Sequence, residues 1–124
     1  MDVSAAVKLV VDEAESDALR RWLGQPRLIG SALLEVELMR AVRRARPDAV
    51  ERARTLLETV GLVPVDEGVL RHAALLDPPV LRTLDAVHLA TALTLRLANL
   101  TLVTYDDRLG DAARAAGLAV VSPA

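Results

Sequence analysis

The stretch Leu81–Leu93, LRTLDAVHLATAL, decides how this chain is expected to fold. It predicts an otherwise apolar helix with Asp85 in its first turn and Thr83 as its N-cap. An apolar run, Leu100–Tyr105, follows and predicts a strand that ends at a second acid, Asp106. An acid at a helix start and an acid at a strand end predict a metal site where the two elements meet.

The composition predicts one compact domain that spans residues 1–124, because 52% of the side chains are hydrophobic. A formal net charge of −2 argues against a simple basic surface for nucleic acid. The only aromatic residues, Trp22 and Tyr105, are too few for base stacking to be the main mode of binding. The absence of cysteine excludes disulfides and thiolate zinc sites. With neither a secretion signal nor a membrane-length apolar run, we expect a cytoplasmic protein.

Hydrophobic periodicity predicts an α/β domain. Helices are expected over residues 4–11, 13–23, 33–46, 48–59, 67–76, 84–98 and 107–116. Short apolar runs predict strands over residues 27–30, 62–65, 101–105 and 118–121. Gly24 and Gly117 are the expected stops of two of the helices. Short apolar strands separated by helices indicate a mostly parallel sheet that is covered on both faces.

Four acids stand out by position: Asp2, Glu37, Asp85 and Asp106. In open parallel sheets, ligands bind outside the carboxyl ends of the strands, and Asp2 and Asp106 lie at such turns. Clustered carboxylates repel one another unless a cation offsets their charge, and Mg²⁺ or Mn²⁺ is the natural occupant. Each acid alone has a simpler explanation, such as the helix dipole for Asp85 or a helix cap for Asp106.

Two other features have a structural and a functional interpretation. His88 follows Asp85 by three residues, and among apolar neighbours it is expected to be a hydrogen-bonded packing residue. The arginines between residues 40 and 54 form a locally basic surface. That surface is either a solvated pair of helices or a contact for the RNA backbone.

Four segments in order resemble the PIN-domain ribonucleases of the VapC toxin type: DVSAAVKLVV at 2–11, VELMRAV at 36–42, LRTLDAVHLATAL at 81–93 and LVTYDDRLGDAARAAGLAVV at 102–121. The resemblance implies a three-layer α/β/α domain with a parallel sheet of strand order 3-2-1-4-5. It also implies a Mg²⁺- or Mn²⁺-dependent endoribonuclease that cleaves RNA loops and is neutralised by a VapB-like antitoxin. A homodimer is expected from the same resemblance and from the apolar composition.

The resemblance assigns the catalytic acids to Asp2, Glu37, Asp85 and Asp106. Asp2, Asp85 and Asp106 would bind the ion, and Glu37 would complete the shell or orient the attacking water. The same motifs also include Ser4, Thr104 and Asp107.

Glu35 competes with Glu37 for the second catalytic position. Two positions on a helix differ by about 200° of rotation, so only one of these carboxylates can face the site. The sequence leaves this choice open.

The chain departs from the family at its first strand. That strand is central in the family's sheet and presents the first acid, whereas here Met1 directly precedes Asp2. Two neighbouring strands would then be left with unpaired backbone groups. Three explanations are open: the start of the chain is assigned too far downstream, the chain is trimmed, or the strand order is altered. We expect the first, with roughly four to six apolar residues in frame before Met1.

Two other classes of function are compatible with acids grouped at strand ends. A catalytically weak or inactive PIN-like module would use its acidic pocket to receive an arginine of a partner protein. A phosphate-accepting receiver domain also groups acids at strand ends, but it requires a lysine after a late strand. The only lysine of this chain is Lys8, which argues against a receiver.

Overall fold

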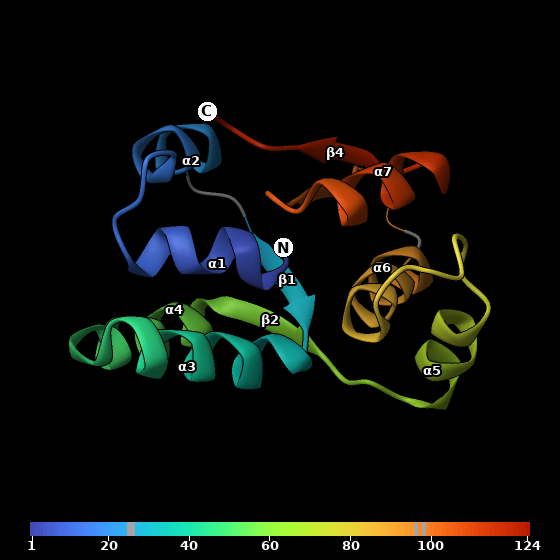
Figure 1. Cartoon of the computed structure of the whole chain (residues 1–124), viewed down its shortest axis with the longest axis horizontal. Helices are drawn as coiled ribbons and strands as arrows, with labels where there is room; N and C mark the ends of the chain where they lie inside the picture. The colour runs from blue at the N-terminus through green and yellow to red at the C-terminus, as the bar shows by residue number, and fades with distance from the viewer. Residues whose placement is uncertain (25–26, 96, 98) are drawn as a thin grey trace.

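The computed structural model describes residues 1–24, 27–95, 97 and 99–124 (Figure 1). The helices are α1 (Val3–Val10), α2 (Ser16–Leu23), α3 (Leu33–Ala45), α4 (Val50–Thr59), α5 (Glu67–Ala74), α6 (Thr83–Leu95) and α7 (Asp107–Ala115), with a 3-10 turn at Pro47–Ala49. The strands are β1 (Leu28–Ser31), β2 (Val60–Val63), β3 (Thr101–Val103) and β4 (Ala119–Val121). Within these residues no helix has both the length and the apolar character needed to cross a membrane.

The strands form two parallel pairs with the start of the chain between them. β1 pairs with β2, and β3 pairs with β4. The amino group of Met1 donates to the Ile29 carbonyl at 3.0 Å, and the backbone N–H of Asp2 donates to the Val103 carbonyl at 3.4 Å. The order is therefore β2, β1, residues 1–2, β3, β4. The strands themselves form two separate two-stranded sheets, and residues 1–2 lie between them, at the position that the expected order 3-2-1-4-5 gives to the first strand.

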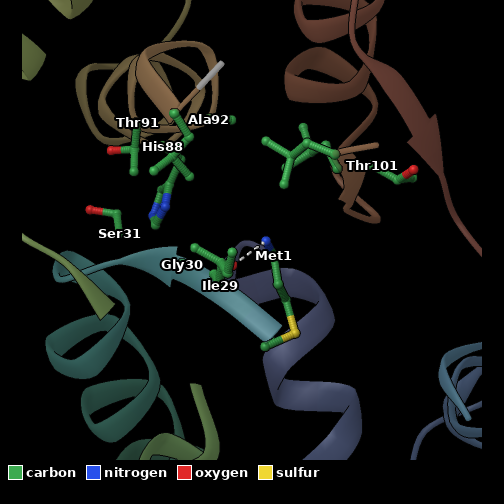
Figure 2. Close-up of a pocket in the computed structure, with 11 residues that line it drawn as sticks. Met1, Ile29, Gly30, Ser31, His88, Thr91, Ala92 and Thr101 are labelled. Atoms are coloured by element: carbon green, nitrogen blue, oxygen red, sulfur yellow. Dashed lines mark hydrogen bonds between the residues drawn. The ribbon is translucent and has the colours of Figure 1, made fainter. Parts of the chain in front are cut away.

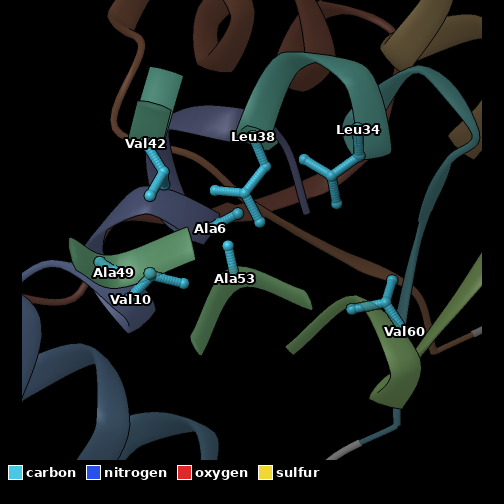
Figure 3. Close-up of a cluster of buried hydrophobic side chains, with 8 residues drawn as sticks. All are labelled: Ala6, Val10, Leu34, Leu38, Val42, Ala49, Ala53 and Val60. Atoms are coloured by element: carbon cyan, nitrogen blue, oxygen red, sulfur yellow. The ribbon is translucent and has the colours of Figure 1, made fainter. Parts of the chain in front are cut away.

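Side chains of the strands alternate between two helical layers. Leu102 packs against Leu89 of α6 and Leu109 of α7. The next residue, Val103, packs on the opposite face against α1 and α2. The face of β1 and β2 toward α1, α3 and α4 is closed by a second cluster (Figure 3), consisting of Ala6, Val10, Leu34, Leu38, Val42, Ala49, Ala53 and Val60. The expected three-layer α/β/α architecture is confirmed.

Helix α6 is the central helix of the second layer. Six consecutive residues of α6, Ala86 to Thr91, are buried. A helix that is buried on several sides shows little amphipathic pattern, and it needs neighbours all round. Those neighbours are α5, α7 and β1. This packing fixes the direction in which the first turn of α6 points.

Several element boundaries differ from the sequence-based expectation. α2 begins at Ser16 rather than at residue 13, because Nζ of Lys8 binds the carboxylates of Glu13 and Glu15 at 2.7 and 2.8 Å and holds this segment as a turn. β2 begins two residues earlier than predicted, at Val60. Thr83 is the first residue of α6 rather than its N-cap, which corrects the prediction.

The predicted stops at the two glycines are confirmed. Gly24 and Gly117 have φ angles of 56° and 93°, in the left-handed region that glycine adopts without strain. The predicted end of the central helix at Ala98 lies outside the described residues.

A cavity lies in the gap between β1 and β3, next to Met1 (Figure 2). Its walls include Ile29 and Gly30 of β1, Thr101 of β3 and the ring of His88. The Met1 ammonium is buried in this gap, and its burial lowers the pKa of that group.

Candidate functional site

Asp2 is buried at the start of α1, with 2% of the residue exposed. Its Oδ1 accepts hydrogen bonds from the Ser4 hydroxyl at 2.7 Å and from the Ala5 N–H at 3.3 Å, so Asp2 is the N-cap of the helix. Its Oδ2 accepts a hydrogen bond from the Thr104 hydroxyl at 2.9 Å. Burial nevertheless raises the pKa of Asp2, because desolvation outweighs these three donors.

Thr104, just after β3, connects Asp2 to Asp106. The backbone N–H of Asp106 donates to Oγ1 of Thr104 at 3.0 Å, while that hydroxyl donates to Asp2. The backbone N–H of Tyr105 donates to the Ser4 hydroxyl at 2.8 Å, which joins the same segment to α1. Asp2 and Asp106 therefore lie on either side of one buried hydroxyl group.

Asp85 and Asp106 converge on a single cation, Arg82. Nε of Arg82 donates to Oδ2 of Asp85 at 3.1 Å, and Nη2 of Arg82 donates to Oδ2 of Asp106 at 2.8 Å. The other oxygen of Asp106 accepts the Leu109 N–H at 3.1 Å and caps α7. The start of α6 and the end of β3 thus bring two carboxylates to one place, as the sequence predicted.

Glu37 faces the same helix as Asp85. Its Oε1 lies 2.5 Å from Nε2 of His88, which is one turn along α6 from Asp85. The side chain of His88 is only 3% exposed, so the expected hydrogen-bonded packing role of this histidine is confirmed. Glu35 is exposed, whereas the Glu37 side chain is 18% exposed. Of the two competing glutamates, Glu37 is the one that points inward.

The donor set suits a hard divalent cation. Asp85 and Asp106 present carboxylate oxygens, the ligand type that Mg²⁺ and Mn²⁺ prefer, and these oxygens already converge on a positive charge. In the part of the chain that the structure describes, no three His, Asp or Glu side chains are arranged to hold an ion. Asp2 is linked to the backbone of Asp106 through the Thr104 hydroxyl rather than to the carboxylates of Asp85 and Asp106.

The sequence over residues 1–115 matches the family model of the PIN domain. Ribonuclease VapC46 of Mycobacterium tuberculosis (strain ATCC 25618/H37Rv) is 49% identical over 125 residues, which cover 99% of this chain and 95% of that protein. This chain belongs to the VapC-type PIN domains. Ribonuclease VapC35 of the same strain is 47% identical over 128 residues, with the same coverage of both chains.

A solved structure shares the fold of this PIN domain. The crystal structure of Mycobacterium tuberculosis VapC20, described as a sarcin-ricin loop cleaving toxin, superposes with a TM-score of 0.77. The match covers 98% of this chain and 97% of VapC20, at 19% sequence identity. At this level of identity the likeness establishes the fold.

The remaining predicted residues of the PIN domain separate into two groups. Ser4 and Thr104 lie at the site, as hydrogen-bond donors to Asp2. Asp107 is the exposed first residue of α7 and points outward, as expected of the less favoured neighbour.

Sequence reasoning missed Arg82. Its spacing of three residues from Asp85 was a visible signal for an ion pair on one helical face. Its second contact, to Asp106, has no such local signal because 24 residues separate the two.

Proposed function

We propose that this PIN domain is a Mg²⁺- or Mn²⁺-dependent endoribonuclease, the toxin of a VapBC-type toxin–antitoxin pair. The observation that carries the proposal is the convergence of Asp85 and Asp106 on one positive charge. This convergence is found in a chain whose sequence is 49% identical, over 99% of its length, to the protein named Ribonuclease VapC46. Buried and half-buried carboxylates that meet in this way require a counter-cation.

Each acid has a distinct proposed role. Asp85 and Asp106 would hold the ion through their Oδ2 atoms. Asp2, which accepts a hydrogen bond from Thr104, would add a third negative charge to the site. When bound, Mg²⁺ or Mn²⁺ activates water and offsets the charge that develops on the phosphate. Glu37, which His88 holds toward α6, would orient the attacking water.

The proposed substrate is RNA in single-stranded or structured loops. Stacking on aromatic rings contributes little, because the chain has only Trp22 and Tyr105. The domain would therefore recognise an RNA loop by its shape and its exposure. The exposed arginines Arg43 and Arg44 of α3 and Arg52 of α4 supply positive charge for the RNA backbone.

The test of this proposal is the effect of Asp85→Asn on cleavage of total bacterial RNA in the presence of Mn²⁺. Loss of a charged ligand is expected to lower the cleavage rate by about a hundredfold or more. Asp111→Asn is the matched control, because Asp111 is an exposed acid on α7 that pairs with Arg114 away from the site. Undiminished cleavage by the Asp85 variant would contradict the proposal.

A second function is favoured by one specific observation. The two carboxylates already bind a guanidinium group, that of Arg82, so the pocket has the chemistry to receive an arginine of a partner protein. In this alternative the domain is a binding module with weak or no turnover. A purified chain that binds a VapB-like protein but leaves RNA intact with Mn²⁺ would support the module over the enzyme.

The proposed partners are a VapB-like antitoxin and a second copy of the chain. Leu75 and Val80, between α5 and α6, are each 85% exposed, and such apolar surface is typical of protein interfaces. Sedimentation that shows only monomer at high concentration would argue against the homodimer. The proposed location is the cytoplasm, where an RNA substrate would be met.

A further inference from the structure

Among the residues that the structure describes, the hydrogen bonds of the Arg82 side chain go to the carboxylates of Asp85 and Asp106. Its side chain is 68% exposed, whereas those of Asp85 and Asp106 are 13% and 19% exposed. Exposed ion pairs of this kind are weak and exchange partners readily. The guanidinium is therefore a solvent-exposed group next to two largely buried carboxylates.

The contacts of Arg82 use the oxygens that a divalent ion would need. Nε and Nη2 bind Oδ2 of Asp85 and Oδ2 of Asp106, respectively. The remaining oxygen of Asp106 is occupied by the Leu109 N–H, so Oδ2 is the atom left for a metal. An ion and the guanidinium cannot both lie between these two carboxylates, because like charges at such short range repel strongly.

The charges favour a defined new partner for the displaced guanidinium. Two carboxylates and Arg82 together carry one negative charge, and a divalent ion changes that sum to one positive charge. One phosphodiester group restores neutrality. Arginine matches phosphate geometry through two parallel N–H donors, so a phosphate of the RNA is the ligand that fits.

We propose that Arg82 exchanges partners during the reaction: it releases Asp85 and Asp106 to the divalent ion and then binds a phosphate of the RNA. This inference rests on the proposed nuclease function and adds a substrate-binding residue to it. Before the ion arrives, Arg82 neutralises the acidic pair. After the ion arrives, Arg82 contributes to affinity for RNA.

The first test measures Mn²⁺ affinity of the whole chain without RNA, from the electron paramagnetic resonance signal of free Mn²⁺. Arg82→Ala is expected to bind Mn²⁺ about threefold tighter, because no guanidinium competes for the carboxylates. Arg82→Lys keeps the positive charge but carries it on a single nitrogen. Its Mn²⁺ affinity is expected to lie between that of the unmodified chain and that of Arg82→Ala. Arg71→Ala is the matched control, since Arg71 is an exposed arginine paired with Glu67 on α5, and no change is expected.

The second test measures binding of a fluorescein-labelled, nuclease-resistant phosphorothioate RNA by anisotropy, with and without Mn²⁺. Arg82→Ala is expected to weaken RNA binding about threefold when Mn²⁺ is present and to have little effect when it is absent. Arg71→Ala removes the same charge and is expected to have little effect in both conditions.

Three results would overturn the partner exchange. They are unchanged or weaker Mn²⁺ binding by Arg82→Ala, equal losses of RNA affinity with and without Mn²⁺, and no loss in either condition. In each case the unmodified chain still binds Mn²⁺, so the proposed nuclease function is unaffected. An unmodified chain that binds no Mn²⁺ would overturn the nuclease proposal and the partner exchange together.

Discussion

Thr104 is one of two side chains, with Ser4, that join Asp2 to the segment after β3. Its hydroxyl donates to the buried carboxylate of Asp2 and accepts from the backbone N–H of Asp106. The residue is 1% exposed, so water cannot replace either hydrogen bond without rearrangement. The Thr104 hydroxyl therefore contributes directly to the relative position of Asp2 and Asp106.

Thr104→Val is expected to lower the free energy of unfolding by about 1–3 kcal/mol, because it leaves buried polar groups without a partner. Thr104→Ser is the matched control: it keeps the hydroxyl and loses only a methyl group, at a cost of about 1 kcal/mol. Urea denaturation of both variants measures the difference. Equal stability of the valine and serine variants would show that the hydroxyl does not hold the site together.

At this scale the sequence predicted that Asp85 and Asp106 lie close together, but it did not predict the arginine that pairs with both. Asp85 and Asp106 were predicted from a helix start and a strand end, which are local features. Ser4 and Thr104 were predicted only through the family resemblance, and the structure places both against Asp2. The bridge from Arg82 to Asp106 depends on tertiary packing of α6 against α7, which no local pattern encodes.

At the scale of elements, the gap between β1 and β3 is the main irregularity of the fold. Only two backbone hydrogen bonds, from Met1 and from Asp2, connect the two strand pairs through residues 1 and 2. Residues 1 and 2 occupy the position that the family resemblance gives to the first strand. The upstream start expected from the sequence stays a prediction.

A chain extended before Met1 by Ile-Val-Ile-Val is expected to be more stable, by roughly 1–3 kcal/mol, because the new residues pair with β1 and β3. A Ser-Gly-Ser-Gly extension of the same length is the control, and little gain is expected from it. Thermal and urea unfolding measure the difference. If the two extensions were equally stable, the gap would not be a site for a strand.

The same variants test the buried amino group. Burial lowers the pKa of the Met1 ammonium below 8.0, so the unfolded chain binds more protons than the folded chain between the lowered pKa and 8.0. The free energy of unfolding of the unmodified chain is therefore expected to rise with pH across that window. In either extended chain this nitrogen is an uncharged amide, so the rise should disappear. A rise of the same size in all three chains would assign it to another group.

Element boundaries show where local patterns are insufficient. Gly24 and Gly117 ended their helices as predicted, since a positive φ is a local property of glycine. The delayed start of α2 depends on Lys8, which reaches from α1 to Glu13 and Glu15 and lies 4.7 Å from the Tyr105 ring centre. Helical periodicity over residues 13–15 cannot report a contact made by a side chain of another helix.

At the scale of the whole molecule, the two helical layers serve to aim three segments at one place. The packing of α6 on both strand pairs presents Asp85, and the packing of β3 between the layers presents Asp106. The α/β architecture was predictable because parallel strands and covering helices follow from alternating patterns. The family resemblance supplied the strand order, which such patterns alone do not determine.

The central claim is that Asp85 and Asp106 share one divalent ion. Anomalous diffraction from a crystal grown with Mn²⁺ tests it most directly. We expect a manganese peak at ligand distance, about 2.0–2.6 Å, from Oδ2 of Asp85 and from Oδ2 of Asp106, with Arg82 moved away from both. A fully occupied manganese site elsewhere, or Arg82 still bridging the two carboxylates at saturating Mn²⁺, would contradict it.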